Sequence, residues 1–585
     1  MPERVRAWTA PESLADLTLF SDWDSVASMI ASLRIHLFEH GTVPVWNFSF
    51  CGGRPELAVP FSWAYTWPSL FAYAFEPNAA ILAVWAALTT VGVLSLAALL
   101  RRWTGSPLAA ATGACLYAFN GYFAVTFVAG HVSFAFFHLV PLLMLLFERS
   151  FAAACRGHSP LGTCALATLA AFALFSGGLP HALFHFYPAL AALILLRVAQ
   201  AAHRSGCAFA LRAATAPCVA HVLGLWLAVY KLWPVMRWQT EFPRGGIYPE
   251  SRSLLAILDG AVGLVPGFLR TDLLGVRDPF RLGGNAYLGP LPWLLAAVAV
   301  VALARRRRSP SGEPGARAPD HLLTAFALAL VLAGLALALG NANPWSPAVW
   351  FAHVPFLAGV RGFGRYEILS IFGVALLAAQ ALACLRRLRL PLAFLAVGPI
   401  LVQAGLLAWR IPALPNAAIV SRYDVEPHPE PPEFIGVPVG TTRHRTALLE
   451  QGYWIANCYE NLTLPAPPVT AAVGARIPLS TPPPARLEAL GRDRLGLGFD
   501  PAYRGWIHLH LPVLESFEYD ATPGWLRHGR VRFRASELAD HRLTIHARYA
   551  GPRDGFIASG LGCVATALFY GGWILRLRRA MGPTH

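Results

Sequence analysis

Long apolar stretches, separated by short polar segments, make up most of the chain from residue 79 onward. Each is close to the ~20 residues that an α-helix needs to cross about 30 Å of hydrocarbon. The third stretch is short, and the pattern leaves open whether the second and third are broken helices. The pattern predicts a mainly α-helical, polytopic transmembrane bundle with about eleven spans. We place these spans at residues 79–100, 107–128, 132–148, 160–177, 181–198, 209–232, 287–304, 322–340, 367–385, 389–409 and 554–575.

The composition agrees with a membrane protein. Apolar residues account for 56% of the chain and charged residues for 14%, whereas soluble domains typically contain about 45–50% and about 25%. So few charges cannot cover the outside of globular domains with that much apolar surface. The composition therefore excludes a soluble protein, a disordered chain and a disulfide-rich scaffold.

Arginine placement predicts the orientation of the spans, because cytoplasmic loops carry an excess of basic residues. An even number of spans, or none, separates each arginine group from the next, so all the groups fit one side. The net charge of +15 comes almost entirely from these clusters, and no basic strip of the kind that binds nucleic acid is present. The groups expected in the cytoplasm are Arg101 and Arg102; Arg149 and Arg156; Arg197, Arg204 and Arg212; Arg305 to Arg308; Arg386, Arg387 and Arg389; and Arg576, Arg578 and Arg579.

This orientation divides the chain into four parts. Residues 1–78 form a first external loop with an acidic motif, and residues 79–410 form the helical core with external loops 233–286 and 341–366. Residues 1–20 contain no apolar run of signal length. We therefore expect either a further helix before Met1 or insertion of span 79–100 as a reverse anchor.

The last two parts are a polar segment and a final span. Residues 411–552 are polar and proline-rich, with period-two alternation in Arg530–Ala535 and Leu543–Tyr549. This alternation is typical of strands and predicts a small extracytoplasmic β-rich domain. Residues 553–585 form the final transmembrane helix and a cytoplasmic tail.

Two acids lie two residues apart near the start of the first external loop. Asp22 and Asp24 precede an amphipathic, aromatic stretch. A carboxylate beside apolar walls at a membrane surface can have its pKa raised and act as a base. The alternative is that both aspartates cap the helix that follows, since Asp is a preferred N-cap residue. The spacing alone favours the capping role.

Several short motifs along the chain resemble those of one family, in the same order. The motifs are Asp22; Leu33-Arg34; Gly41-x-x-Pro-x-Trp-Asn47; Gly53-x-Pro55; Phe119-Asn-Gly-Tyr122; Gly130-His131; Pro141; Gly178-Leu-Pro-His181; Tyr287-Leu-Gly-Pro290; Val360-Arg-Gly-Phe-Gly-Arg365; Pro523-Gly-Trp525; Tyr549; and Gly555-Phe-Ile-Ala-Ser-Gly560. The set resembles the YfhO-like bacterial membrane proteins, which belong with the GT-C glycosyltransferases. The chain departs from the family pattern at its start, where the family has a spanning helix before the acidic loop, and at Trp23 and Asp24, which replace the usual polar residues.

The resemblance implies an enzyme. GT-C enzymes transfer a sugar from a polyprenyl-phosphate donor to an acceptor on the outer face of the membrane, with inversion at the sugar carbon. The acceptor would be an envelope polymer, glycolipid or protein, and the enzyme would lie in a bacterial cytoplasmic (inner) membrane. An aspartate of the first external loop, Asp22 or Asp24, would take the acceptor proton. Glu241, just outside a span, is a second candidate base. Some GT-C enzymes use a divalent cation, for which Asp22 and Asp24 would be the expected ligands; no metal ligand set is assigned.

The donor phosphate requires fixed positive groups, and guanidinium groups suit phosphate through bidentate contacts. External arginines near spans can supply them, or can instead snorkel to lipid headgroups. Arg34 can alternatively pair with a loop aspartate, and Arg252 is a further external arginine. His181 and His185 have the i, i+4 spacing of a metal pair, although intramembrane histidines also hydrogen-bond between helices. The expected substrate-binding residues are Arg34, Trp46, Asn47, His131, His181, Arg244, Arg361 and Arg365.

Two other classes of function compete with the transferase. A transporter or flippase of lipid-linked saccharides would show paired broken spans in two related halves, and the sequence shows no such symmetry. A non-catalytic cell-envelope assembly protein, whose β domain binds a wall polymer, is the competing function that the sequence excludes least well.

Overall fold

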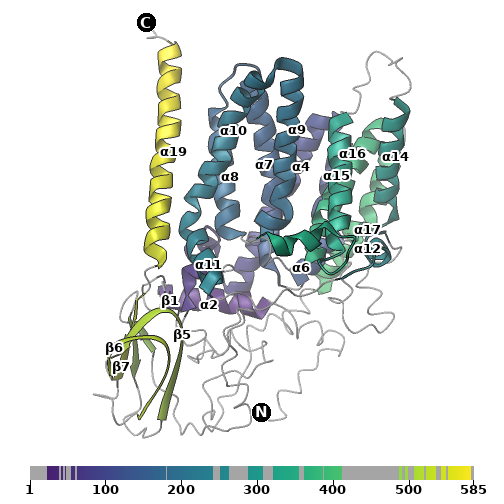
Figure 1. Ribbon diagram of the computed structural model, residues 1–585. Helices are drawn as coiled ribbons and strands as arrows, with labels where there is room; N and C mark the ends of the chain where they lie inside the picture. Colours follow the sequence, from purple (N-terminus) through teal and green to yellow (C-terminus); the bar gives the residue numbers. More distant parts are fainter. Residues whose placement is uncertain are drawn as a thin grey trace. The chain divides into compact units, whose positions relative to one another are not determined.

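The computed structural model shows a mainly helical protein (Figure 1). The chain forms two compact units. Unit 1 comprises residues 1–83, 229–246 and 413–559, and unit 2 comprises residues 84–228, 247–412 and 560–585. The structure describes residues 23–38, 41, 43, 46–47, 54–59, 62–128, 130–178, 181–241, 251–262, 287–306, 321–354, 362–385, 388–410, 487–489, 494–498, 506–519, 522–534, 542–548 and 551–581.

Seven helical segments among the described residues are long and apolar enough to cross a membrane. They indicate a multi-pass membrane protein, as the apolar pattern predicted. Shorter apolar helices cover the predicted spans at α8 (Leu161–Gly177), α14 (Pro290–Arg306) and the first half of α17 (Arg389–Arg410). The total of eleven spans stays a prediction. The seven segments are Pro77–Thr104 (α4), Val132–Cys155 (η3 and α7), Leu183–Ser205 (η4 and α9), Cys207–Leu227 (α10), His321–Ala338 (α15), Phe363–Cys384 (η6 and α16) and Ile557–Arg576, within α19 (Gly551–Met581).

The second predicted span is a broken helix. It forms α5 (Pro107–Ala118) and α6 (Gly121–Val128), with Phe119 and Asn120 between them. The buried Asn120 side chain serves both helix ends: its Nδ2 donates to the carbonyls of Leu116 and Tyr117, and its Oδ1 accepts from Phe123 N at 3.2 Å. One amide therefore satisfies backbone groups that the break would otherwise leave unpaired.

Helix α16 (Glu367–Cys384) lies at the centre of unit 2, where it packs on α15, α14 and α5. Its contact with α15 depends on close backbone approach. A Cβ atom on Gly373 would lie only 2.5 Å from the carbonyl oxygen of Ala327. Small residues allow such approach, and packing of this kind drives association of helices in a membrane. The buried Thr324 hydroxyl also donates to Gln380 Oε1 at 2.6 Å between the same helices.

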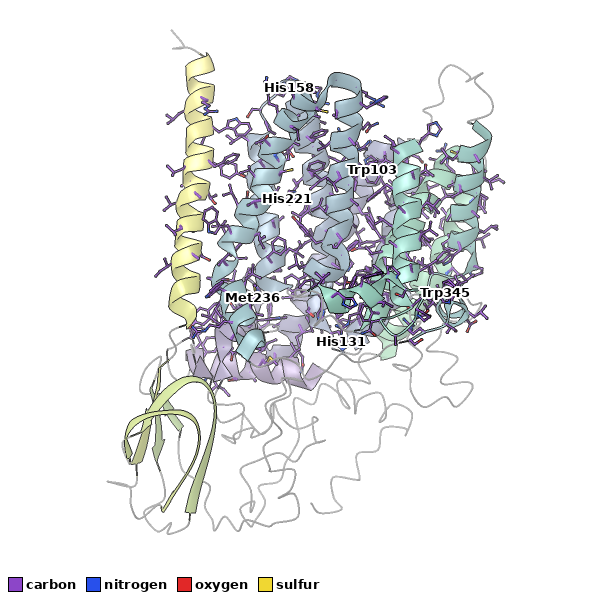
Figure 2. All side chains as sticks on the ribbon, in the orientation of Figure 1. Trp103, His131, His158, His221, Met236 and Trp345 are labelled. Atoms are coloured by element: carbon purple, nitrogen blue, oxygen red, sulfur yellow. The ribbon has the colours of Figure 1, made fainter. Side chains whose placement is uncertain are left out.

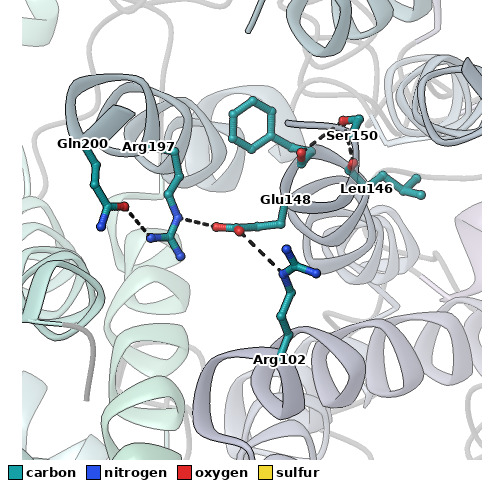
Figure 3. A network of polar contacts seen from close by, with 7 residues as sticks. Arg102, Leu146, Glu148, Ser150, Arg197 and Gln200 are labelled. Atoms are coloured by element: carbon teal, nitrogen blue, oxygen red, sulfur yellow. Dashed lines mark hydrogen bonds and ion pairs between the residues drawn. The ribbon is translucent and has the colours of Figure 1, made fainter. Parts of the chain in front are cut away.

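Three helices of unit 2 meet at a buried carboxylate. Glu148 on α7 (Leu139–Cys155) accepts from Arg197 Nε at 2.6 Å, and its second oxygen lies 4.0 Å from Arg102 Nε on α4 (Figure 3). Arg197 belongs to α9 (Tyr187–Ser205) and also donates to Gln200. Arg102 and Arg197 were both assigned to the cytoplasmic side, and the structure places them at the same end of the bundle. Which membrane side this end faces stays a prediction.

Unit 1 contains short elements from distant parts of the sequence. They are α2 (Trp23–Phe38), β1 (Trp46–Asn47), β2 (Arg54–Pro55), η2 (Glu56–Ala58), α3 (Ser69–Ala74) and α11 (Val229–Glu241). β1 and β2 pair antiparallel, with Trp46 opposite Pro55. The predicted helix is present as α2, but it begins at Trp23, between the two aspartates, so Asp24 is its second residue and does not precede it.

Unit 1 also contains an antiparallel five-stranded sheet in the order β3-β4-β7-β5-β6. Strands β6 and β7 cover the two stretches that alternate with period two, apart from their last residue. Most of residues 411–552 lie outside the described residues, so the extent of a β-rich domain stays a prediction. The strands are β3 (Leu487–Ala489), β4 (Arg494–Gly498), β5 (Trp506–Tyr519), β6 (Thr522–Arg534) and β7 (Arg542–Arg548).

Candidate functional site

Irregular backbone elements of unit 2 converge around one arginine. They are the start of α6, the 3-10 helix η3 (Val132–His138), the π-helix η4 (Ala182–Phe186) and the 3-10 helix η6 (Phe363–Tyr366). π-helical turns are frequent at functional sites. Non-regular backbone at membrane depth is tolerated only where protein or a water-filled cavity surrounds it. These elements carry, or directly follow, four of the motifs that the sequence analysis identified.

Arg365, on η6, is half-buried and held on three sides. Its Nη1 lies 3.3 Å from His181 Nδ1, and its Cζ lies 5.3 Å from the centre of the Phe134 ring. Its carbonyl oxygen accepts from the Tyr122 hydroxyl at 3.3 Å. Gly362 precedes η6 with φ +70°, a left-handed conformation that a residue with a side chain rarely adopts. The guanidinium is therefore positioned by η3 and by the residue before η4, and the backbone of Arg365 is held by α6.

Three residues predicted from distant motifs meet at the Phe134 ring. The His181 ring stacks on it, with centroids 4.7 Å apart, and the His131 ring lies 5.5 Å away. Figure 2 labels His131 at this end of unit 2. His131, His181 and Arg365 thus lie together around one ring. We call these three residues and Phe134 the Arg365 cluster. Phe134 was not predicted; the only signal in the sequence was the aromatic stretch Phe134–Phe137.

The geometry of His181 favours a neutral imidazole. Its Nδ1 faces a guanidinium, which can only donate, so Nδ1 is the acceptor and Nε2 carries the proton. His185 lies in the π-turn and its Nδ1 hydrogen-bonds with the His181 carbonyl oxygen at 3.0 Å. The two rings are 5.7 Å apart. Among the described residues no group of three or more His, Cys, Asp or Glu could hold a metal ion.

An ion pair supports the Arg365 cluster from the start of α16. Arg252 Nη1 donates to Glu367 Oε1 at 2.6 Å, and the two side chains are 15% and 3% exposed. Asn343 holds the Arg252 carbonyl at 3.1 Å, and Arg252 N donates to the carbonyl oxygen of Leu339 at 2.9 Å. Arg252 was considered above as a phosphate ligand. It is instead paired with the buried carboxylate of Glu367, two residues after Arg365.

The Tyr287 motif joins the same region. Gly121 N donates to the carbonyl oxygen of Tyr287 at 2.9 Å, which connects the break between α5 and α6 with the start of α14. The motifs at 119–122 and 287–290 thus position backbone beside the Arg365 cluster.

In unit 1, Arg34 has a structural contact. Its Nη1 donates to the carbonyls of Ala72 and Phe75 at 3.1 and 2.7 Å, and its Nη2 lies 2.8 Å from Glu76 Oε1. A cation at this place satisfies the last carbonyls of α3. The predicted alternative partner of Arg34 was a loop aspartate; the observed one is Glu76.

Lys231 is a buried residue of unit 1 to which the sequence analysis gave no role. It is the only lysine in the chain and is fully buried on α11. Its Nζ donates to the carbonyls of Val59 at 2.8 Å and Glu56 at 3.4 Å. Glu56 is also buried, and its carboxylate accepts from the Ser62 hydroxyl. The one signal for Lys231 in the sequence was that it is a single lysine in a chain whose other basic residues are nearly all arginine.

The other predicted site residues cannot be placed by their side chains. Asp22, Arg244 and Arg361 lie outside the described residues. The backbones of Asp24, Glu241, Trp46 and Asn47 belong to α2, α11 and β1, but their side chains are outside the description. Their assignment as catalytic or substrate-binding residues stays a prediction.

The chain belongs to the class of multi-pass membrane proteins, and its best-defined candidate site is a cationic cluster. Searches with family models, curated proteins and solved structures find no match to this chain. The chemistry of the site is therefore inferred from its own residues. A half-buried guanidinium held against an aromatic face, with two imidazole rings beside it, suits an anionic group such as a phosphate.

Proposed function

We propose that this protein is a GT-C-type glycosyltransferase. It moves a sugar from a polyprenyl-phosphate donor to an envelope polymer, glycolipid or protein on the outer face of a bacterial cytoplasmic membrane. The observation that supports this most directly is the convergence of His131, His181 and Arg365. Each was expected to bind substrate from a separate sequence motif, and together they make a cationic group suited to phosphate.

The proposed reaction needs an acid residue and a cation. Asp22 or Asp24 takes the proton of the acceptor hydroxyl, and the oxygen attacks the sugar carbon. The bond from that carbon to the donor phosphate breaks, and polyprenyl phosphate leaves with the bonding electrons. Arg365 stabilises the charge that develops on the phosphate. Glu241 is the second candidate for the base, and a divalent cation at the aspartates is an alternative way to stabilise the charge.

The topology in this proposal follows from the arginine groups. With about eleven spans, the first external loop and the β-rich domain of residues 411–552 both face outside. The final helix, residues 553–585, then ends in the cytoplasm. The β-rich domain is proposed to bind the acceptor polymer, because it is the largest polar part of the chain on that side.

The experiment is sugar transfer by the purified full-length protein in lipid vesicles. The donors are a panel of radiolabelled polyprenyl-phosphate sugars, and the acceptor is an extract of envelope glycan and lipid. Arg365→Ala is expected to reduce transfer by about 100-fold or more, as loss of one charge-stabilising group typically does. Arg365→Lys is expected to retain part of the activity, because lysine supplies charge without the bidentate geometry.

Asp22→Asn and Asp24→Asn identify the base, and the same test applies to Glu241→Gln. Arg212→Ala is the matched control, because Arg212 is an exposed arginine of α10 that lies in another part of unit 2. If the wild type transfers no sugar from any donor, the proposal is wrong. It is also wrong if Arg365→Ala and all three acid variants transfer as fast as the Arg212 control.

A further inference from the structure

A short segment after α15 exposes two tryptophans from a firmly held backbone. Residues 341–354 contain the 3-10 helix η5 (Pro347–His353), which is capped by Ser346. The Ser346 hydroxyl also donates to the carbonyl oxygen of Ala336 at 2.9 Å, and Ala348 is fully buried. The backbone is thus fixed to the end of α15.

The side chains of Trp345 and Trp350 nevertheless project outward. They are 86% and 70% exposed, whereas tryptophan is usually well buried. The backbone N–H of Trp345 donates to Asn343 Oδ1 at 3.0 Å. The exposed Trp345 side chain therefore projects from a backbone that is held in place. The segment 341–354 contains no Asp, Glu, Lys or Arg. Its exposed surface is therefore mainly apolar and aromatic, with His353 as its one titratable side chain.

The position in the chain indicates what contacts this surface. α15 is a membrane-length apolar helix that ends at Ala338, and Trp345 follows seven residues later. The segment therefore lies at a boundary of the bilayer. Tryptophan is enriched at this boundary, because its ring is apolar and its indole N–H can donate to polar lipid groups.

The same segment packs on the element that carries Arg365. The Phe351 ring lies 5.8 Å from the Phe363 ring and 5.9 Å from the Tyr366 ring of η6. We propose that Trp345 and Trp350 form a lipid-contact surface that anchors η5 and η6 at the headgroup boundary, at the depth where a lipid-borne phosphate reaches Arg365. The occupant of the surface is the glycerophospholipid bilayer itself. The link to Arg365 rests on the proposed function; the lipid contact does not.

The experiment uses the full-length protein in phospholipid nanodiscs. The photoreactive residue p-benzoylphenylalanine replaces Trp345 or Trp350, one at a time, and adducts are identified by mass spectrometry after illumination. Leu195→p-benzoylphenylalanine is the positive control, because Leu195 is 70% exposed on the membrane-length helix α9. Phospholipid adducts at both positions, with yields similar to the control, are expected. Adducts to a second copy or to another protein, or no adduct at either position, would overturn the proposal.

Conservative variants provide a second readout that does not depend on tolerance of the photoreactive residue. The fluorescence difference between wild type and Trp345→Phe/Trp350→Phe reports the two tryptophans alone. Lipids brominated near the carbonyl end of the chains should quench this difference more strongly than lipids brominated near the methyl end. Equal quenching by the two lipids, or no quenching by either, would refute the boundary position. If sugar transfer cannot be detected while the lipid adducts form, the proposed function fails and the lipid-contact surface stands.

Discussion

The ion pair between Arg252 and Glu367 indicates a structural role for Arg252. A substitution at Arg252 can distinguish this role from phosphate binding. Glu367 is 3% exposed and Arg252 is 15% exposed, with 2.6 Å between Nη1 and Oε1. We consider the change Arg252→Met, which removes the charge but keeps an apolar stem of similar length. The carboxylate of Glu367 would then be left buried without its cation.

The expected cost is large. Removing one partner of a buried ion pair typically costs about 3–5 kcal/mol. Two features indicate that the cost for this pair is near the lower end of that range. Glu367 lies in the first turn of α16, where the helix N-terminus favours an anion by about 0.3–1 kcal/mol. In addition, Arg252 Nη2 makes no hydrogen bond with a described residue. We therefore expect a loss of about 3 kcal/mol, or roughly 100-fold in the unfolding equilibrium.

The assay is reversible unfolding in mixed detergent micelles, followed by tryptophan fluorescence. Glu367→Gln is expected to cost less, about 1–2 kcal/mol, because the amide still accepts a hydrogen bond. The double variant Arg252→Met/Glu367→Leu should be close to wild type, since a buried pair can be replaced by apolar residues with little loss. A loss under about 1 kcal/mol for Arg252→Met, together with weaker phosphate binding, would refute the structural role.

Three further predictions concern stability and use thermal unfolding in the same micelles. Lys231→Met should lower the free energy of unfolding by about 1–3 kcal/mol, because it leaves two buried carbonyls unpaired; an unchanged midpoint would show that water or another group replaces the ammonium. Gly373→Ala should cost about 1–3 kcal/mol by forcing α15 and α16 apart, while Gly398→Ala, which meets open space, should cost nothing; equal effects would refute the packing argument. Arg197→Met should cost about 3 kcal/mol, because it leaves the buried Glu148 with only the more distant Arg102, and full recovery in Arg197→Met/Glu148→Leu would confirm that the charge is responsible.

The sequence predicted the helical core well, for a physical reason. Apolar runs of span length have few alternative structures, because backbone groups in lipid must be paired within the segment. The break between α5 and α6 was left open, since it depends on how one side chain, Asn120, satisfies two helix ends. The limits of the shorter helices were also less predictable, because packing on neighbouring helices rather than length keeps them in place: α5 and α14 pack on α16, and α8 packs on α7 and α10.

The site was predicted only in part. The motifs identified His131, His181 and Arg365. The sequence could not show that Phe134 brings them together, because η3 contains three phenylalanines and no local pattern sets Phe134 apart from Phe136 and Phe137. Arg252 looked like the other external arginines. Its difference lies in Glu367, more than a hundred positions away, which no local pattern connects with it.

The buried position of Lys231 has a practical consequence for chemical labelling. No other side chain in the sequence carries a primary amine, so the folded protein should resist succinimide esters and amine cross-linkers everywhere except at its α-amino group. Modification of Lys231 would then require opening of the contacts around Val59 and α11. The rate of its acylation would report local unfolding of that part of unit 1 without any engineered probe.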